Sequence, residues 1–296
     1  MGAADVIPGV SGGTIAFITG IYDELIDSLK AVNPKAAMIL FRQGPAAFWQ
    51  AVNGNFLLSL IAGIFTSLLT LAHAITYLMS QYPVLLWAFF FGLVAASAVH
   101  IAREINFRSV PSLFTFLLGL GLAVVITSSN PVQVEPSHLK VFAAGAVAIC
   151  AMILPGISGS FILLLLGLYG FVLESVKALD VGVLLFFMAG CIGGLLSFVH
   201  LLSWLLHHYR SVSIALLTGF LLGSLNALWP WKQVLEYYES SKGLKPLVQQ
   251  NVWPADYATV TQQDPMLLAC IVLAIVGMLV VLGLELISKS ENNTQS

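Results

Sequence analysis

The sequence predicts an all-α integral membrane protein made of two inverted-topology repeats, each a re-entrant broken-helix hairpin followed by three transmembrane helices. Three observations predict this fold: an apolar composition, long apolar runs and a duplicated Pro-Gly motif. Of the 296 residues, 58% are hydrophobic and only 9% are charged. Soluble proteins carry about 25% charged residues, and the apolar runs are longer than the ~10 residues of a barrel strand. The class is therefore helical and membrane-embedded.

The charged residues and the cysteines exclude several functions. The chain holds 12 Lys and Arg against 14 Asp and Glu, which leaves no basic stripe for a phosphodiester backbone. Cys150, Cys191 and Cys270 lie in apolar runs without the spacing of metal ligands, so we interpret them as small packing residues. We therefore expect no nucleic-acid partner, no metal site and no cofactor.

Six apolar runs are candidate transmembrane helices. Each approaches or exceeds the ~17–25 residues that a helix needs to cross a bilayer. The run at 112–127 is the shortest of them. The predicted spans are 56–79, 84–102, 112–127, 181–206, 212–230 and 266–287.

Two further apolar regions are interrupted and predict re-entrant hairpins at 1–30 and 139–178. The interruptions are Pro8-Gly9 and Pro155-Gly156. Proline removes a backbone donor, and the residue before it avoids the helical region, so one helix ends there and another begins. Non-helical backbone at membrane depth must be surrounded by protein or by a water-filled cavity. We therefore expect both breaks to face each other in the interior.

Internal repetition sets the domain boundaries. Shifting the chain by 147 residues gives 10 identities in the 24 positions from 8 to 31, and a shift of 127 residues gives 10 identities over 62–98. The difference predicts an interfacial insertion at 31–55 in the first repeat, 1–130. The second repeat is then 131–296. Three crossings per repeat is an odd number, so the second repeat is inverted relative to the first.

The Lys and Arg residues predict the orientation in the membrane. This topology places seven of the twelve on the side of the termini and five opposite. Positive charge favours the cytoplasmic side, so we expect cytoplasmic termini and an external loop at 232–264.

The two Pro-Gly motifs have the chemistry of an anion site. In each copy, Pro-Gly-Val/Ile-Ser-Gly-Gly/Ser opens a helix, where free N–H groups and the helix dipole favour an anion. The alternative is that these small residues only permit tight packing of the turn. The predicted substrate-binding residues are Pro8, Gly9, Ser11, Gly12, Gly13, Thr14, Pro155, Gly156, Ser158, Gly159 and Ser160.

The motifs resemble those of the polyprenyl-phosphate transporter (PopT) family, formerly catalogued as a domain of unknown function. The first resemblance is Asp-Val-Ile-Pro-Gly-Val-Ser-Gly-Gly-Thr at 5–14 with Gly-Ile-Tyr at 20–22. The second is Leu-Pro-Gly-Ile-Ser-Gly-Ser-Phe at 154–161 with Gly-Leu-Tyr at 167–169. The resemblance covers essentially the whole chain. It implies a bacterial inner-membrane protein that returns undecaprenyl phosphate to the inner leaflet for recycling in cell-envelope synthesis.

The start of the chain departs from the repeat. The second hairpin has an apolar arm from about 139, whereas only seven residues precede Pro8. We therefore expect that a leader has been missed or removed. This leaves the role of Asp5 open, because it lies three residues before Pro8.

Four ionisable residues are candidates for proton or polar contacts: Asp5, His73, His200 and Arg103. Asp5 and the matching histidines of the two repeats would lie at membrane depth, where ionisable groups are functional candidates. Their alternative roles are backbone capping and packing hydrogen bonds. Arg103 lies at the end of a predicted span, which favours a role in anchoring the helix at the membrane surface. Neither motif contains a Lys or Arg that could neutralise a phosphate. Either the cavity stays hydrated or a distant cation such as Arg103 folds into it.

Two other functions stay open at this point. Undecaprenyl-pyrophosphate phosphatases also use duplicated re-entrant hairpins, but their Pro-Gly-x-Ser motif continues with an arginine that holds phosphate. Here Gly12 and Gly159 occupy that position, so we expect no catalytic residue and no enzyme. The third possibility is an ion-coupled carrier of a small soluble anion.

Overall fold

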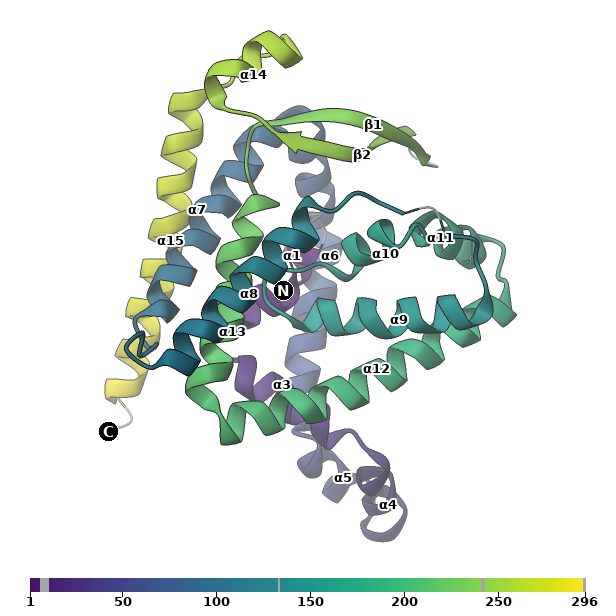
Figure 1. The fold of residues 1–296 in the computed structure, drawn as a ribbon. Coiled ribbons are helices and arrows are strands. Elements are labelled where there is room, and N and C mark those ends of the chain that lie inside the picture. Colours follow the sequence, from purple (N-terminus) through teal and green to yellow (C-terminus); the bar gives the residue numbers. More distant parts are fainter. Residues whose placement is uncertain (6–10, 133, 241–242, 295–296) are drawn as a thin grey trace.

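The computed structural model describes residues 1–5, 11–132, 134–240 and 243–294 (Figure 1). The chain is predominantly helical, and its helices form one bundle with a small β-hairpin at one end. Within these residues, four single helices are long and apolar enough to cross a membrane, and a bent helix pair is a fifth candidate. Broad apolar surfaces, such as Leu58, Phe65 and Leu69 on one long helix, are exposed as lipid-facing residues would be.

The first hairpin consists of three short helices, α1 (Gly2–Asp5), α2 (Gly12–Ile18) and α3 (Tyr22–Ala31). Helix α1 lies inside the bundle, and its Gly2 packs against the backbone of Ile64. Gly20 reverses the chain between α2 and α3 with a φ of 74°, which glycine adopts without steric cost. The predicted break at Pro8-Gly9 lies outside the described residues.

The predicted insertion at 31–55 contains two helices, α4 (Pro34–Gln43) and α5 (Pro45–Ala51). The Asn33 side chain caps α4, and each helix has proline at its first position, where a missing N–H costs nothing. Both helices project from one end of the bundle (Figure 1). Their exposed apolar side chains include Phe41 and Met38.

The three predicted spans of the first half are helices, and each extends slightly beyond its predicted bounds. All three contain a long window of apolar residues that is able to cross a membrane. The run predicted at 112–127 extends to 19 helical residues. The helices are α6 (Gly54–Gln81), α7 (Pro83–Ala102) and α8 (Val110–Ser128).

The second hairpin is broken twice. Helix α9 (His138–Ile153) ends before Pro155, α10 (Gly159–Leu165) follows, and α11 (Tyr169–Lys177) is bent from α10 by 110°. Gly156 makes the first break with a φ of 90°. The second break is at Gly167, where an added Cβ would lie 2.1 Å from the carbonyl oxygen of Val132.

The later predicted spans correspond to helices α12 (Val181–His208), α13 (Arg210–Gly223) and α15 (Leu267–Thr294). Within the described residues, α12 is long and apolar enough to cross a membrane, whereas the apolar parts of α13 and α15 are shorter. The predicted bounds 212–230 are wrong at their C-terminal end. Helix α13 ends at Gly223 and continues only as the 3-10 turn η1 (Ser224–Asn226). The remaining apolar residues of that run leave the helix because they join an aromatic cluster at the chain turn, where the Trp229 and Trp231 rings meet edge to face.

The predicted external loop at 232–264 contains a small β-hairpin and a helix within an otherwise helical protein. Strands β1 (Lys232–Ser240) and β2 (Gly243–Asn251) pair antiparallel, and α14 (Pro254–Thr261) follows. They lie at the end of the bundle opposite α4 and α5 (Figure 1). The indole N–H of Trp229 donates to Val252 O at 2.9 Å and ties the base of the hairpin to the bundle. Polar composition predicted the surface position but not the strand pairing.

Close helix pairs form the frame of the bundle. Helix α12 runs beside α9, and α13 beside α8 (Figure 1). Glycines permit this approach, because a Cβ on Gly190 would lie 2.0 Å from Phe142 O and one on Gly219 would lie 2.1 Å from Phe116 O. Small residues are the usual means by which membrane helices pack closely. This frame holds the second hairpin against the first.

Candidate functional site

The two motifs meet directly. The Ser11 hydroxyl accepts the Thr14 N–H at 3.2 Å as the N-cap of α2, and it also donates to Leu154 O at 3.2 Å. From the second motif, the Gly156 N–H donates to Thr14 Oγ1 at 2.8 Å. Residues separated by more than 140 positions in the sequence are thereby joined by side-chain hydrogen bonds.

The hydroxyl groups form a single relay between the two motifs. Ser11 Oγ and Thr14 Oγ1 are 3.2 Å apart. Because Ser11 donates to Leu154 O, the hydrogen bond between the two hydroxyls must run from Thr14 to Ser11. The direction is then Gly156 N–H to Thr14, Thr14 to Ser11, and Ser11 to Leu154 O. Ser11 and Thr14 are each 1% exposed, so the relay is closed from solvent.

Backbone contact adds to these hydrogen bonds. A Cβ on Gly13 would lie 2.3 Å from Ile153 O, so the first turn of α2 presses on the end of α9. The Tyr22 hydroxyl donates to the same carbonyl at 3.3 Å from the start of α3. Ile153 O therefore receives contacts from both α2 and α3.

The second motif keeps its helix N-terminus free of side-chain capping. Ser158 precedes α10, and its hydroxyl bonds to that of Ser160 at 2.9 Å instead of to an α10 amide. Ser158 is buried and Ser160 is exposed. Among the described residues, the amides of Gly159 and Ser160 have no hydrogen-bond partner, as is usual for the first turn of an uncapped helix.

Asp5 occupies the helix N-terminus of the first motif. Its Oδ1 accepts the Gly12 N–H at 2.7 Å. An anionic oxygen therefore already lies at the first turn of α2, as the partial positive charge of a helix N-terminus favours. In this structure, therefore, the Gly12 amide has a partner from the chain itself.

The other candidate ionisable residues lie elsewhere. His73 on α6 and His200 on α12 are exposed, and His200 Nδ1 is 2.7 Å from Leu196 O in its own helix. Arg103 is exposed at the C-terminal end of α7. Within the described residues, none of the three makes a hydrogen bond or ion pair with either motif. This structure does not fold Arg103 into the site.

Two further residues support the junction and were not predicted as site residues. The first is Tyr22, which contacts Ile153 O. The second is Ser224, which packs against Gly156 so closely that a Cβ added to Gly156 would lie 2.7 Å from Ser224 Oγ. Ser224 is fully buried. The signal that could have found both residues is the repeat alignment, in which Tyr22 matches Tyr169 and Ser224 matches Ser97.

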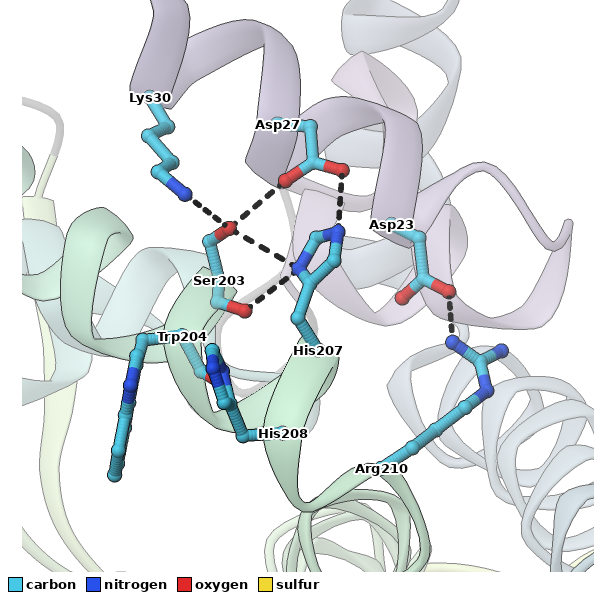
Figure 2. A network of polar contacts seen from close by, with 8 residues as sticks. All are labelled: Asp23, Asp27, Lys30, Ser203, Trp204, His207, His208 and Arg210. Atoms are coloured by element: carbon cyan, nitrogen blue, oxygen red, sulfur yellow. Dashed lines mark hydrogen bonds and ion pairs between the residues drawn. The ribbon is translucent and has the colours of Figure 1, made fainter.

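A second polar cluster lies between α3 and the α12–α13 junction (Figure 2). Asp23 accepts a hydrogen bond from Arg210 at 2.5 Å. Asp27 accepts the Ser203 hydroxyl at 2.9 Å and lies 3.6 Å from His207 Nε2. We call the following six residues the α3–α12 network: Asp23, Asp27, Lys30, Ser203, His207 and Arg210.

The fold and the junction define a class of protein. It is a membrane protein with several apolar helices, in which the break of the second hairpin is buried against the first hairpin. Membrane transporters place irregular backbone in this way around a substrate site.

Comparison with known proteins specifies the class further. Residues 1–246 match the family described as VCA0040-like, undecaprenyl phosphate translocase-like. A polyprenyl-phosphate transporter of Vibrio cholerae serotype O1 is 48% identical over 286 residues, 96% of this chain and 93% of the relative. A polyprenyl-phosphate transporter of Staphylococcus aureus is 32% identical over 248 residues, 78% of this chain and 83% of the relative. No solved structure matches significantly. The chain belongs to the undecaprenyl phosphate translocase-like family, which confirms the resemblance seen in the motifs.

Proposed function

We propose that this protein carries undecaprenyl phosphate from the outer to the inner leaflet of the bacterial inner membrane, for recycling in cell-envelope synthesis. The observation that carries the proposal is the similarity, over 96% of the chain, to a relative named as a polyprenyl-phosphate transporter. The second motif supports it, because the uncapped first turn of α10 leaves amides free for a phosphate next to the buried junction of the two motifs. The lipid is moved intact in this proposal.

We propose further that the chain consists of two inverted repeats, 1–130 and 131–296, with both termini cytoplasmic. Matching elements support the repeats, since α2 and α10 each have 7 residues and α6 and α12 each have 28. The excess of Lys and Arg on the side of the termini supports the orientation.

The phosphate headgroup binds in this proposal where the two motifs meet. The predicted binding residues are Ser11, Gly12, Gly13, Thr14, Gly156, Ser158, Gly159 and Ser160, and Pro8, Gly9 and Pro155 complete the set. Among the described residues, the Gly159 and Ser160 amides are free to donate. Ser11, Gly12, Thr14 and Gly156 must first exchange their present hydrogen-bond partners for the phosphate. A hydrogen bond to a charged group contributes about 1.5–3 kcal/mol net, and full desolvation of an ion costs tens of kcal/mol. The headgroup therefore keeps part of its hydration while it crosses.

Proteoliposomes test the transport proposal. Vesicles containing the purified protein and polyprenyl phosphate are treated with an external phosphatase that cannot cross the bilayer, and released phosphate is followed. We expect release to continue past the outer-leaflet pool, because transport brings inner-leaflet lipid to the phosphatase. Release that stops at the outer-leaflet pool, as in protein-free vesicles, would contradict the proposal.

Vesicles that contain the protein and polyprenyl pyrophosphate, without added phosphatase, test for hydrolysis by the protein itself. We expect no phosphate release. The arginine of the phosphatase motif has no room at Gly159, because a Cβ there would lie 2.6 Å from the backbone oxygen of Ala148. Phosphate release without the external enzyme would favour the hydrolase.

The position of Asp5 predicts that the binding of polyprenyl phosphate depends on pH. The ionised carboxylate on the Gly12 amide repels a phosphate and competes for the same donor. Protonation removes both effects, so lowering the pH strengthens binding in the wild type by linkage. In Asp5→Asn we expect tighter binding and a smaller dependence on pH. The measurement is polyprenyl phosphate affinity against pH for both proteins. The phosphate itself titrates near pH ~6, so only the difference between the two curves reports on Asp5. Identical curves would show that Asp5 does not cause the pH dependence of binding.

A further inference from the structure

An apolar contact joins the site to the α3–α12 network. Leu25 and Ile26 of α3 are buried in one cluster with Val199, Leu202 and Leu206 of α12. The same cluster contains Ala16 of α2 and Ile153 of α9. Helix α3 thus contacts the junction of the motifs through Tyr22 at its first residue. Its apolar face packs along α12.

The polar network continues this contact toward the C-terminal end of α12. Ser203 is its centre, because its hydroxyl donates to Asp27 at 2.9 Å and accepts from Lys30 Nζ at 3.0 Å (Figure 2). Ser203 has no exposed surface. Three residues of the network therefore join α3 to α12 at one buried hydroxyl.

The histidine strengthens this contact when it carries two protons. His207 Nδ1 lies 2.8 Å from Ser203 O, a contact that requires hydrogen on that nitrogen. Nε2 lies 3.6 Å from Asp27 Oδ2, and it attracts the carboxylate only when it is protonated as well. The ionisable groups facing it are Asp27 and Lys30 from α3, with Asp23 paired to Arg210 of α13 one turn away.

The corresponding contact at the other hairpin lacks such a network. In the repeat alignment, Asp27 and Lys30 of α3 match Glu174 and Lys177 of α11. Both residues of α11 are exposed, and in the described chain neither side chain makes a hydrogen bond or ion pair. The two hairpins therefore differ. Polar side chains link α3 of the first hairpin to α12, whereas the matching residues of α11 in the second hairpin form no such link.

We propose that the α3–α12 network is a gate that closes the mouth of the headgroup site on the side of α4 and α5. This inference rests on the proposed transport function. When α3 separates from α12, the headgroup can pass between them from the junction of the motifs. The cations of the network, Lys30 and Arg210, then lose their partners on the opposite helix and face the anionic headgroup.

The exposure of the network suits a contact that must open in each cycle. His207 and Asp27 side chains are 59% and 48% exposed, and exposed ion pairs contribute little to stability. A cavity of about 70 Å³ already lies among Asp23, Asp27, Leu206, His207 and Arg210. Water can therefore reach these groups. When α3 moves away from α12, the charged side chains stay hydrated.

A reversible cross-link tests the gate. In a background with Cys150, Cys191 and Cys270 replaced by alanine, Asp27→Cys and Ser203→Cys are joined by a short reducible bis-thiosulfonate reagent. We expect the cross-linked protein to lose at least about tenfold in polyprenyl phosphate transport, and reduction to restore the rate of the untreated double variant. Transport by the cross-linked protein at the rate of the reduced protein would overturn the gate.

Two controls make the result specific. Trp49→Cys with Asn55→Cys joins α5 to α6 on the same side of the bundle, at a pair whose side chains are hydrogen-bonded at 2.9 Å. We expect this cross-link to leave transport unchanged. The reduced proteins test the proposed function separately, because failure to transport before cross-linking counts against transport itself, whereas transport that cross-linking does not stop counts against the gate alone.

Thiol labelling measures gate opening without transport. Ala16→Cys places a reporter in the buried cluster between the motifs and the network. We expect a membrane-impermeant maleimide, applied from the side of α4 and α5, to label it about fivefold faster when Asp27→Asn is added. Glu24→Gln is the matched control, because Glu24 lies on α3 but bonds to Asn53 outside the network. Equal labelling with Asp27→Asn and with Glu24→Gln would overturn the gate.

Discussion

Replacing Gly13 with alanine is expected to lower polyprenyl phosphate transport at least about tenfold. The added Cβ would lie 2.3 Å from Ile153 O and 2.9 Å from the carbonyl carbon. Because these are backbone atoms, they cannot move aside as a side chain does, so α2 must shift away from α9. The shift lengthens the hydrogen bond between Thr14 and Gly156, on which the geometry of the proposed headgroup site depends.

The control for this change is Gly63→Ala on α6. Nothing lies within 4 Å of the added Cβ there, and alanine favours the helix over glycine by about 1 kcal/mol. We expect Gly63→Ala to transport at the wild-type rate with equal or higher stability. The measurement is phosphate release in proteoliposomes, normalised to folded protein in the membrane. A Gly13→Ala protein that transports as well as Gly63→Ala would show that the contact between α2 and α9 has no functional role.

Replacing Thr14 with valine is expected to have an effect of similar size. Valine has nearly the same shape but cannot accept the Gly156 N–H or donate to Ser11. A buried amide left without a partner costs about 1–3 kcal/mol. The hydrogen-bond relay between the two motifs is therefore broken. We expect transport to fall about tenfold or more.

Thr14→Ser distinguishes the loss of the hydroxyl from a loss of packing. Serine retains the donor and acceptor, so we expect transport within about threefold of the wild type. Thr66→Val is the matched control, because the exposed Thr66 hydroxyl bonds only to Ala62 O in its own helix. Polyprenyl phosphate binding and transport are measured for all three variants. Equal loss in Thr14→Ser and Thr14→Val would assign Thr14 to packing instead of hydrogen bonding.

The sequence by itself determined the features that depend on local composition. Long apolar runs predicted most of the spanning helices, because a helix that faces lipid needs about 20 apolar residues whatever its neighbours are. Proline, glycine and the repeated motif predicted where the hairpins break, since these residues act on their own backbone. Family membership followed from the same motifs and was confirmed by the relatives.

The tertiary structure alone decided which groups meet. The relay from Gly156 to Thr14 and Ser11 depends on the relative position of two hairpins, and no local pattern encodes that position. The strands β1 and β2 form because two polar segments pair with each other, whereas single-segment polarity predicts only a loop. In the same way, Asp27 and Ser203 are unremarkable polar residues of separate helices until the packing of α3 on α12 brings their side chains within 2.9 Å. Hydrogen bonds between distant segments require the whole bundle, because their energy depends on distances that only the packed helices set.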